Sequence, residues 1–329
     1  MENLERLEEL TIVPISRISR SDIEMHGGKA ANLARLHRMG INVPQGFSVS
    51  SSVFTDMVIS NPEAQELIKI ISDSNDIDAI LTYTSDLQKI IENIKIPKGT
   101  RSKILGAYRN LRKKSRQEEP NFAIRSSATV EDRDDFSFAG QARSFLCVSK
   151  EGDILDCIKG VWASSFTPQA VFYLRDNNVH LSTAKMATVV QEMIPADVSG
   201  VMFTANVISK NTDEILLNAT WGLGETLVSG QVVPDTYVVG KQNLEVLEQR
   251  LGSKKRMCIP ETSEKGRHVK IVETPQSKKD MHSLTCKEIK NLAQIGLQIE
   301  RCFESAQDIE WCLNDSEVAI VQSRPITTI

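Results

Sequence analysis

The sequence predicts a protein of mixed helices and strands, α/β or α+β in class, organised as two lobes. Apolar residues at helical spacing dominate residues 51–117, whereas segments with strand character recur from residue 121 onward. Two of these later segments are joined through Pro195. We therefore expect a first lobe over residues 1–195 and a second lobe over residues 196–329.

The composition excludes several classes of protein. The chain of 329 residues is 40% hydrophobic and 25% charged, which is enough for a real core in one large or two medium domains. A net charge of −4 argues against a nucleic-acid-binding protein, and no apolar run approaches the roughly 18 residues of a membrane span. The N-terminal "MENLERLEEL" is not a signal peptide, and the six cysteines contain no C-x-x-C pair. We expect a cytoplasmic protein with reduced thiols, no zinc site, and no nucleic-acid or membrane partner.

A Gly-Gly pair precedes the first predicted helix in "HGGKAANLARLHRMGINVPQGFSV". This stretch is typical of a loop, a helix that ends at Gly40, and an extended segment. Two glycines and Lys29 at a helix N-terminus can present backbone N–H groups and an ammonium to a phosphate. The P-loop pattern is not met, because its upstream glycine is missing. A plain helix-entry turn explains the same residues.

Residues 51–117 are helical in character, and the part from Arg101 to Arg116 is dense in Lys and Arg. A solvated helix face is the simpler interpretation of this basic segment. A docking surface for a partner is the alternative.

Two further segments of the first lobe carry polar residues at strand ends. In "NFAIRSSATVEDRDDFSFAGQARSFLCV", Arg125 could reach a triphosphate, and the loop that contains Gly140 could fold over a nucleotide. A solvated acidic loop is the alternative for residues 131–135. In "VVQEM", a strand could lie behind a purine, with the backbone at Glu192 and Met193 facing the edge of the base. A plain core strand explains that segment as well.

The second lobe contains a turn rich in glycine. "EILLNATWGLGETLVSGQVVPDTYVV" predicts a strand, a turn with a short helix, and another strand, and its glycines would let a sugar or phosphate approach near Glu225. A structural turn explains this motif nearly as well. Further on, "TCKE" is a capping box that opens a helix with the apolar stripe Ile289, Leu292, Ala293, Ile299 and Phe303.

The last residues predict a β-hairpin with one polar and one apolar face. Strand alternation places Asp308, Glu310 and Cys312 on one face of the first strand, opposite to Ile309, Trp311 and Leu313. In the second strand it groups Ile320, Gln322 and Arg324. A three-residue turn over residues 315–317 pairs Glu310 with Gln322, Asp308 with Arg324, and Trp311 with Val321, whereas a slip of one residue mixes polar and apolar side chains.

This register brings oxygen ligands next to a guanidinium. Mg²⁺ prefers hard oxygen ligands from one or two protein groups together with substrate phosphates, and Glu310 and Gln322 are suitable. Arg324 adds a planar set of donors for phosphate. An exposed hairpin with an Asp308–Arg324 cross-strand pair is the alternative.

The order of these motifs resembles a known family. "GGKAANLARL", "AIRSSATVED", "FAGQ", "QEMIPADVSGVMFT", "WGLGETLVSGQVVPDTY" and "DIEW…VQSRPIT" are similar to the nucleotide-binding region of the phosphoenolpyruvate synthase and pyruvate phosphate dikinase family. Rifampicin phosphotransferase and phenylphosphate synthase share this region. The resemblance covers about residues 15–327 and implies an α+β, ATP-grasp-like fold in which ATP lies between two lobes.

The resemblance also implies site residues and cofactors, namely ATP and Mg²⁺. It assigns phosphate contacts to Lys29, Arg125, Asp308 and Arg324, and catalysis of the transfer to Lys29, Arg125 and Arg324. It assigns Mg²⁺ to Glu310 and Gln322. It assigns the adenine to Glu192 and Met193, with Gln191 among the nucleotide-binding residues. It assigns the ribose side to Glu225, and closure over the phosphates to the loop around Gly140. Enzymes of this family transfer the β,γ-phosphates of ATP to a histidine and release AMP and phosphate, which depends mainly on positioning and charge neutralisation.

Some family features are missing. The accepting histidine of the family follows a Gly-Gly, Thr-rich motif, which none of the five histidines here does (His26, His37, His180, His268 and His282). We therefore expect the histidine, and the site for the second substrate, on a partner subunit or another domain. One expectation is the ATP-binding subunit of a split enzyme, with phenol as final acceptor as in phenylphosphate synthase. The alternatives are an N-terminal domain cut from phosphoenolpyruvate synthase or rifampicin phosphotransferase, a regulatory nucleotide-binding module, and a one-step kinase that makes ADP.

Overall fold

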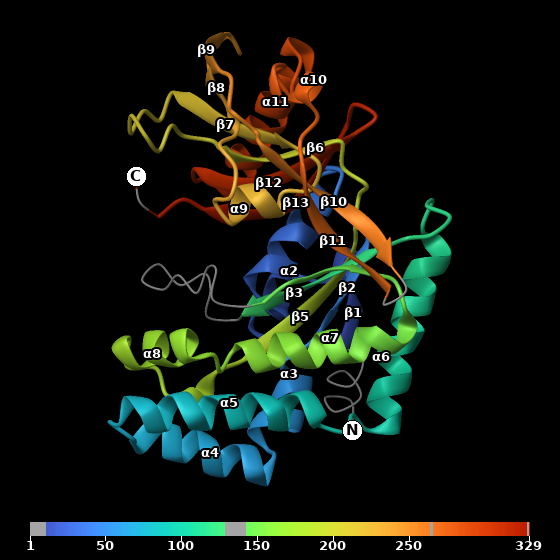
Figure 1. Cartoon of the computed structure of the whole chain (residues 1–329), viewed down its shortest axis with the longest axis vertical. Coiled ribbons are helices and arrows are strands. Elements are labelled where there is room, and N and C mark those ends of the chain that lie inside the picture. Colours follow the sequence, from blue (N-terminus) through green and yellow to red (C-terminus); the bar gives the residue numbers. More distant parts are fainter. Residues whose placement is uncertain (1–10, 129–142, 264–265, 328) are drawn as a thin grey trace. The chain divides into compact units, whose positions relative to one another are not determined.

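The computed structural model describes residues 11–128, 143–263, 266–327 and 329. Its helices and antiparallel sheets confirm the α+β class (Figure 1). The chain divides into two compact units, Met1–Ala34 with Gln45–Met193, and Arg35–Pro44 with Ile194–Ile329. Residues 35–44 belong to the second unit although they lie between two segments of the first unit in the chain. The sequence did not predict this.

The first unit contains a five-stranded antiparallel sheet in the order β1-β2-β5-β3-β4. Its strands are β1 (Ile12–Pro14), β2 (Gly46–Val49), β3 (Phe122–Ala128), β4 (Phe145–Val148) and β5 (Met186–Glu192). Its helices are α2 (Ile23–Arg38, which continues into the second unit), α3 (Ser51–Phe54), α4 (Pro62–Asp73), α5 (Ile77–Asn93), α6 (Lys98–Lys114), α7 (Glu151–Ser164) and α8 (Pro168–Asp176). Short helical turns are η1 (Ile15–Arg17), η2 (Arg20–Asp22), the π-helical η3 (Thr55–Ile59) and η4 (Leu181–Thr183).

Local sequence explains where several of these helices begin. Pro62 and Pro168 occupy first-turn positions, where the missing N–H of proline is harmless. The preceding residues, Asn61 and Thr167, accept hydrogen bonds from the third backbone N–H of each helix. The basic segment forms α6 and the residues that follow it, and its Lys and Arg side chains are exposed.

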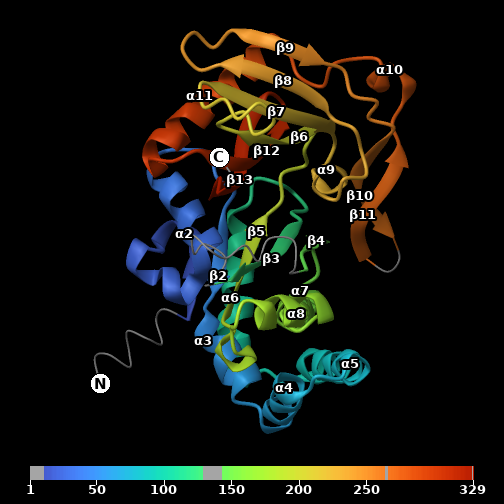
Figure 2. The ribbon, with the colours of Figure 1, turned by 90° about the vertical axis from the view of Figure 1, so that its left-hand side faces the viewer.

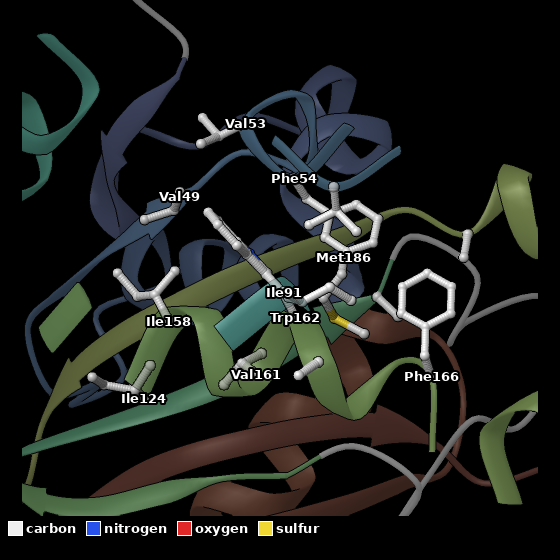
Figure 3. Close-up of a cluster of buried hydrophobic side chains, with 14 of the residues drawn as sticks. Val49, Val53, Phe54, Ile91, Ile124, Ile158, Val161, Trp162, Phe166 and Met186 are labelled. Carbon is white, nitrogen blue, oxygen red and sulfur yellow. The ribbon is translucent and has the colours of Figure 1, made fainter. Parts of the chain in front are cut away.

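One face of the first sheet packs on the main core of this unit. Phe122, Ile124 and Ala128 of β3 point into the core, and α7 adds Trp162, which lies edge-on against Phe54 at 6.3 Å between ring centroids (Figure 3). Because side chains alternate along a strand, Arg125 and Ser127 lie on the opposite face of β3.

The second unit contains a six-stranded antiparallel sheet in the order β13-β12-β6-β7-β8-β9 and a separate two-stranded ribbon (Figure 2). The sheet strands are β6 (Val198–Phe203), β7 (Glu214–Trp221), β8 (Asp235–Gly240), β9 (Val246–Arg250), β12 (Gln307–Asn314) and β13 (Glu317–Pro325). The ribbon pairs β10 (Arg256–Ser263) with β11 (Gly266–Glu273). The helices are α9 (Glu225–Val228), α10 (Gln276–Lys279) and α11 (Cys286–Phe303).

Helix α11 covers the core of the second unit. Thr285 and Glu288 form the predicted capping box, with reciprocal hydrogen bonds of 3.3 and 2.8 Å between side chains and backbone N–H groups. The predicted stripe packs on the sheet, with its first four residues buried and Phe303 partly buried. Within the described residues, no helix is long and apolar enough to span a membrane.

A buried ion pair holds three segments of the second unit together. The Lys254 ammonium donates to the Asp235 carboxylate, and both side chains are fully buried. The same carboxylate accepts hydrogen bonds from the Gly252 N–H at 2.8 Å and from the N–H and hydroxyl of Ser283, each at 2.7 Å. Every oxygen of the carboxylate is thus paired, as a buried charge requires.

Candidate functional site

The Gly-Gly motif forms a break inside α2 and not a loop before it. Gly27 has φ 75° and ψ 165°, a conformation that is essentially restricted to glycine. A Cβ atom at Gly27 would lie 2.2 Å from the carbonyl oxygen of Ser127 in β3. The residue must therefore be glycine for two reasons, its backbone angles and the close approach of β3.

The Ser127 hydroxyl bridges this break. It donates to the carbonyl of His26 at 2.7 Å and accepts from the N–H of Ala30 at 3.2 Å, so it contacts the helix on both sides of Gly27. The His26 ring in turn lies 3.0 Å from the Ser48 hydroxyl of β2, between Nδ1 and Oγ. The Ala30 N–H, one of the helix N-terminal donors expected to face phosphate, is thus paired within the protein.

Lys29 lies beside the same strand. Its Nζ donates to the carbonyl of Ser126 at 2.8 Å, and the side chain is half-buried. Arg125 shares a face of β3 with Ser127, which contacts α2, so the structure brings the Lys29 and Arg125 motifs to one face of the first sheet. A lysine ammonium has three donors, and the Ser126 carbonyl takes one of them.

The end of β5 places its three candidate residues differently. Gln191 is buried opposite Ala123 and lies on the same face as Arg125. Glu192 points to the other face, where its carboxylate accepts from the Ser115 hydroxyl at 2.5 Å and from the Gln117 amide at 3.1 Å. The Glu192 side chain is thus bound by the segment that follows α6.

The backbone at the end of β5 is also hydrogen-bonded within the first unit. The N–H of Glu192 donates to Gln45 O and that of Met193 donates to Asn121 O, each at 2.8 Å. The Met193 carbonyl accepts from the Gln117 amide at 2.7 Å. A carbonyl oxygen can accept a second bond but an N–H donates only once, so an adenine here would have carbonyl acceptors available and not these two N–H groups. The adenine assignment to Glu192 and Met193, and nucleotide binding by Gln191, stay predictions with this restriction.

In the second unit, the closing hairpin has the predicted polar pairs. Glu310 lies opposite Gln322, and Asp308 lies opposite Arg324. The predicted three-residue turn is wrong, because Asp315 and Ser316 form a two-residue turn in which both have positive φ, 47° and 64°.

The pairing of Trp311 with Val321 is also wrong. Trp311 pairs with Ile320, and Val321 is an extra residue in a β-bulge before Gln322. Ile320 lies in the core with Trp311, so the expectation that Ile320 shares a face with Gln322 and Arg324 is wrong as well. The bulge moves Gln322 to the face of Glu310.

The Asp308–Arg324 pair is partly shielded from water. Two guanidinium nitrogens of Arg324 lie 2.9 and 2.8 Å from one carboxylate oxygen of Asp308, whose side chain is 14% exposed. Burial raises the pKa of Asp308, the Arg324 charge opposes this shift, and the neighbouring Glu310 adds to it. The pair thus holds Arg324 beside the Glu310–Gln322 pair.

The donor set of this face fits Mg²⁺. One carboxylate and one amide oxygen lie opposite each other, which matches an ion that takes one or two protein ligands and completes its octahedron with phosphates and water. The described residues contain no group of three or more His, Cys, Asp or Glu side chains that could hold a metal ion. A metal at Glu310 and Gln322 would therefore depend on oxygens from a bound substrate.

The remaining candidates are less informative. Glu225 is exposed at the first position of α9. Gly222, three residues earlier, has φ 75°, and a Cβ atom there would collide with the carbonyl oxygen of Cys258 in β10. The structural interpretation thus accounts for Gly222, and a ribose contact at Glu225 stays a prediction. Gly140 lies outside the described residues.

The sequence alone did not reveal the roles of Ser127, Ser115 and Gln117. Their hydrogen-bond partners in these contacts lie 76 to 101 residues away in the chain. No local pattern marks such contacts, since they depend on how strands and helices pack.

Comparison with known proteins identifies the family. Residues 23–329 match the family model of the pyruvate phosphate dikinase AMP/ATP-binding domain. The probable phosphoenolpyruvate synthases of Methanocaldococcus jannaschii and Methanothermobacter thermautotrophicus are 36% and 38% identical, over 96% and 95% of this chain and 26% and 45% of their own lengths. The rifampicin phosphotransferase of Streptomyces sviceus is 36% identical over 99% of this chain and 37% of its own length.

This chain therefore spans less than half the length of these relatives. Among solved structures, D-alanine–D-alanine ligase from Bacillus anthracis superposes with a TM-score of 0.32 and 9% identity, over 94% of this chain and 59% of that one, which is too loose a likeness to carry an argument. The match of the family model over residues 23–329 and the three sequence relatives agree with the motifs. The chain belongs to the pyruvate phosphate dikinase AMP/ATP-binding domain family.

Proposed function

We propose that this chain binds Mg-ATP and acts as the nucleotide-binding part of a dikinase-type phosphotransferase. The observation that carries the proposal is the hairpin of the second unit, where Glu310 lies opposite Gln322 and Asp308 opposite Arg324 on one face. Such a face offers two oxygen ligands for Mg²⁺ and a guanidinium for phosphate. Family membership supports ATP as the nucleotide.

The first unit would supply the other phosphate contacts. Lys29 and Arg125 lie at one face of its sheet, and both carry a positive charge that suits a triphosphate. Phosphoryl transfer requires little covalent chemistry from the protein, because positioning and neutralisation of the developing charge account for most of the catalysis. Lys29, Arg125 and Arg324 are the residues to which we assign these tasks.

The proposed reaction transfers the β,γ-phosphates of ATP to a histidine that lies on a partner subunit or on another domain. The O–P bond between the α- and β-phosphates breaks, a bond from phosphorus to the histidine nitrogen forms, and AMP leaves. Water then removes the terminal phosphate, and the phosphohistidine passes its group to a small hydroxyl or enol compound. Phenol is the specific acceptor that we propose, by likeness to phenylphosphate synthase.

A second arrangement is a nucleotide-binding domain of one longer enzyme, as in phosphoenolpyruvate synthase or rifampicin phosphotransferase. It is favoured by the curated relatives, which contain the matched region within longer chains. The two arrangements share the chemistry of the ATP site and differ in where the histidine lies.

The test uses ATP labelled at the β-phosphate, mixed with this chain and an extract of its source organism. The proposal expects AMP as product and the label on another polypeptide, as an adduct that acid destroys and base does not. Addition of phenol should then discharge the label into phenyl phosphate. ADP as the product would identify a one-step kinase, and ATP binding without any turnover would indicate a regulatory module. Label that appears only on a longer polypeptide containing this sequence would favour the second arrangement.

A further inference from the structure

We propose that Ser127 is the positioning residue for Lys29, and that its hydroxyl determines where the Lys29 ammonium meets the phosphates of ATP. The inference rests on the proposed function, because it takes Lys29 as a phosphate contact. Ser127 carries no charge, and in this proposal it does not contact the nucleotide itself.

The hydroxyl of Ser127 closes the break in α2. Gly27 interrupts the helix, so the carbonyl of His26 and the N–H of Ala30 are not joined by a regular helical ladder at this point. Ser127 Oγ satisfies both groups, donating to the first at 2.7 Å and accepting from the second at 3.2 Å. One hydroxyl has one donor and two acceptor positions, so serine or threonine can make this bridge and alanine cannot.

The bridge is closed to water. His26, Ala30 and Ser127 are each fully buried, and Gly27 packs directly against the Ser127 carbonyl. If the hydroxyl were removed, solvent could not replace it without opening this contact, so a polar group on each side of the break would lose its partner. The turn would then be free to shift relative to β3.

Lys29 lies between the two anchored positions. Its backbone is fixed by the neighbouring Ala30 bond, and its Nζ donates to the carbonyl of Ser126 at 2.8 Å. Both ends of the lysine side chain are thus held by consecutive residues of β3. Arg125 lies on the same strand and shares the face of Ser127, so the bridge also sets the separation between the Lys29 and Arg125 charges.

A double-mutant cycle tests the proposal. Calorimetry would give the dissociation constants of Mg-ATP and of adenosine for the wild type, Ser127→Ala, Lys29→Ala and the double variant. We expect Ser127→Ala to weaken Mg-ATP binding about 5- to 30-fold. In the Lys29→Ala background, Ser127→Ala should change the constant by less than about twofold, because its effect passes through the missing ammonium. Adenosine has no phosphate, so its binding should not change in any variant.

Additive losses of Mg-ATP affinity would overturn the proposal while leaving the proposed function intact, as would an equal loss of adenosine binding in Ser127→Ala. Failure of the wild type to bind Mg-ATP would overturn both. Thr188→Val is the matched control, because it removes a buried hydroxyl of the neighbouring strand β5 that has no hydrogen-bond partner among the described residues. It should bind Mg-ATP like the wild type.

Hydrogen exchange at the Ala30 amide gives a readout that does not need nucleotide. Ser127→Ala should accelerate this exchange and Thr188→Val should not. Faster exchange with unchanged Mg-ATP affinity would show that the bridge is merely structural and would overturn the proposal. If Ser127→Ala fails to fold, two other variants replace it. Ser127→Thr keeps the hydroxyl, whereas Ser127→Cys has only a weak thiol donor. The proposal expects the Cys variant to bind Mg-ATP more weakly than the Thr variant.

Discussion

Glu310 lies directly opposite Gln322 because strand β13 contains a β-bulge, in which Val321 is an extra residue. Simple alternation along β13 would put Gln322 on the same face as Ile320, which is buried in the core. The bulge at Val321 removes that constraint, and Gln322 and Arg324 share the face of Glu310 and Asp308. Bulges that re-aim a side chain are common beside functional sites. The local departure from regular structure is thus what assembles the proposed metal-binding face.

The first prediction concerns Glu310, the proposed metal ligand. Glu310→Ala should reduce Mg-dependent phosphoryl transfer by about 10²-fold or more, since a charged transition-state contact is lost. The fold should remain, because the side chain is only partly buried on the surface of the hairpin. Turnover and thermal unfolding of the same preparation would check both statements. Glu317→Gln, in the exposed part of the hairpin, is the control and should leave turnover unchanged.

The second prediction compares two single-residue deletions in β13. Deletion of Val321 removes the bulge but leaves Ile320 opposite Trp311 and Gln322 opposite Glu310, so the chain should fold and keep Mg-dependent nucleotide binding. Deletion of Ser323 should instead turn Arg324 toward the core, at a cost of about 3–5 kcal/mol for a buried charge without its partner. Chemical unfolding and Mg-ATP binding of both variants would test this. A Val321 deletion as damaging as the Ser323 deletion would contradict the described register.

The hairpin also shows how far the sequence could lead. Segregation of polar and apolar residues was enough to pair Glu310 with Gln322, because any one-residue slip mixes the faces. The expected three-residue turn gave the same offset at Glu310 as the actual two-residue turn followed by a bulge. The wrong turn length and the missed bulge cancel at the polar pairs, so these were predicted correctly. They do not cancel at Trp311, which pairs with Ile320 and not with Val321. A bulge leaves no signal in composition, so it could not be predicted.

In the first unit, local patterns located strands β2 to β5 and the helical character of residues 51–117, but not β1, α7, α8 or the polar contacts. The Gly-Gly motif was predicted as a loop before a helix, because glycines weaken helices. The structure instead continues the helix on both sides of Gly27, since Ser127 supplies the missing partners. Likewise, the binding of Glu192 by Ser115 and Gln117 depends on the packing of α6 against the sheet. Both features depend on tertiary contacts, which local patterns in a single sequence do not predict.

The third prediction concerns the buried ion pair. Lys254→Met should destabilise the protein by about 3–5 kcal/mol, because it leaves the Asp235 carboxylate buried without its cation. Joint replacement of both residues by apolar ones should cost less than the single change. Denaturant unfolding would measure both. Lys270→Met is the control, since this lysine pairs with Glu261 at the surface of the β10–β11 ribbon and its loss should scarcely change the unfolding midpoint.

The fourth prediction concerns the pH dependence of Cys147. Burial raises the pKa of this thiol from its ordinary 9.0 to about 11. The folded protein therefore keeps the thiol proton in a range where the unfolded chain releases it, so stability falls as pH rises from 9 toward 11. The loss should be on the order of 2–3 kcal/mol over this range, at about 1.4 kcal/mol for each unit of pKa difference.

Comparison with Cys147→Ala isolates this contribution, because the variant lacks the thiol and all other groups cancel in the difference. Urea unfolding of both proteins between pH 8 and pH 11 should show the gap in stability moving in favour of the variant as pH rises. Alkylation provides an independent readout. At pH 8, iodoacetamide should modify the exposed Cys286 well before the buried Cys147. Equal modification rates for the two thiols, or a stability gap independent of pH, would show that the Cys147 thiol is not held protonated by burial.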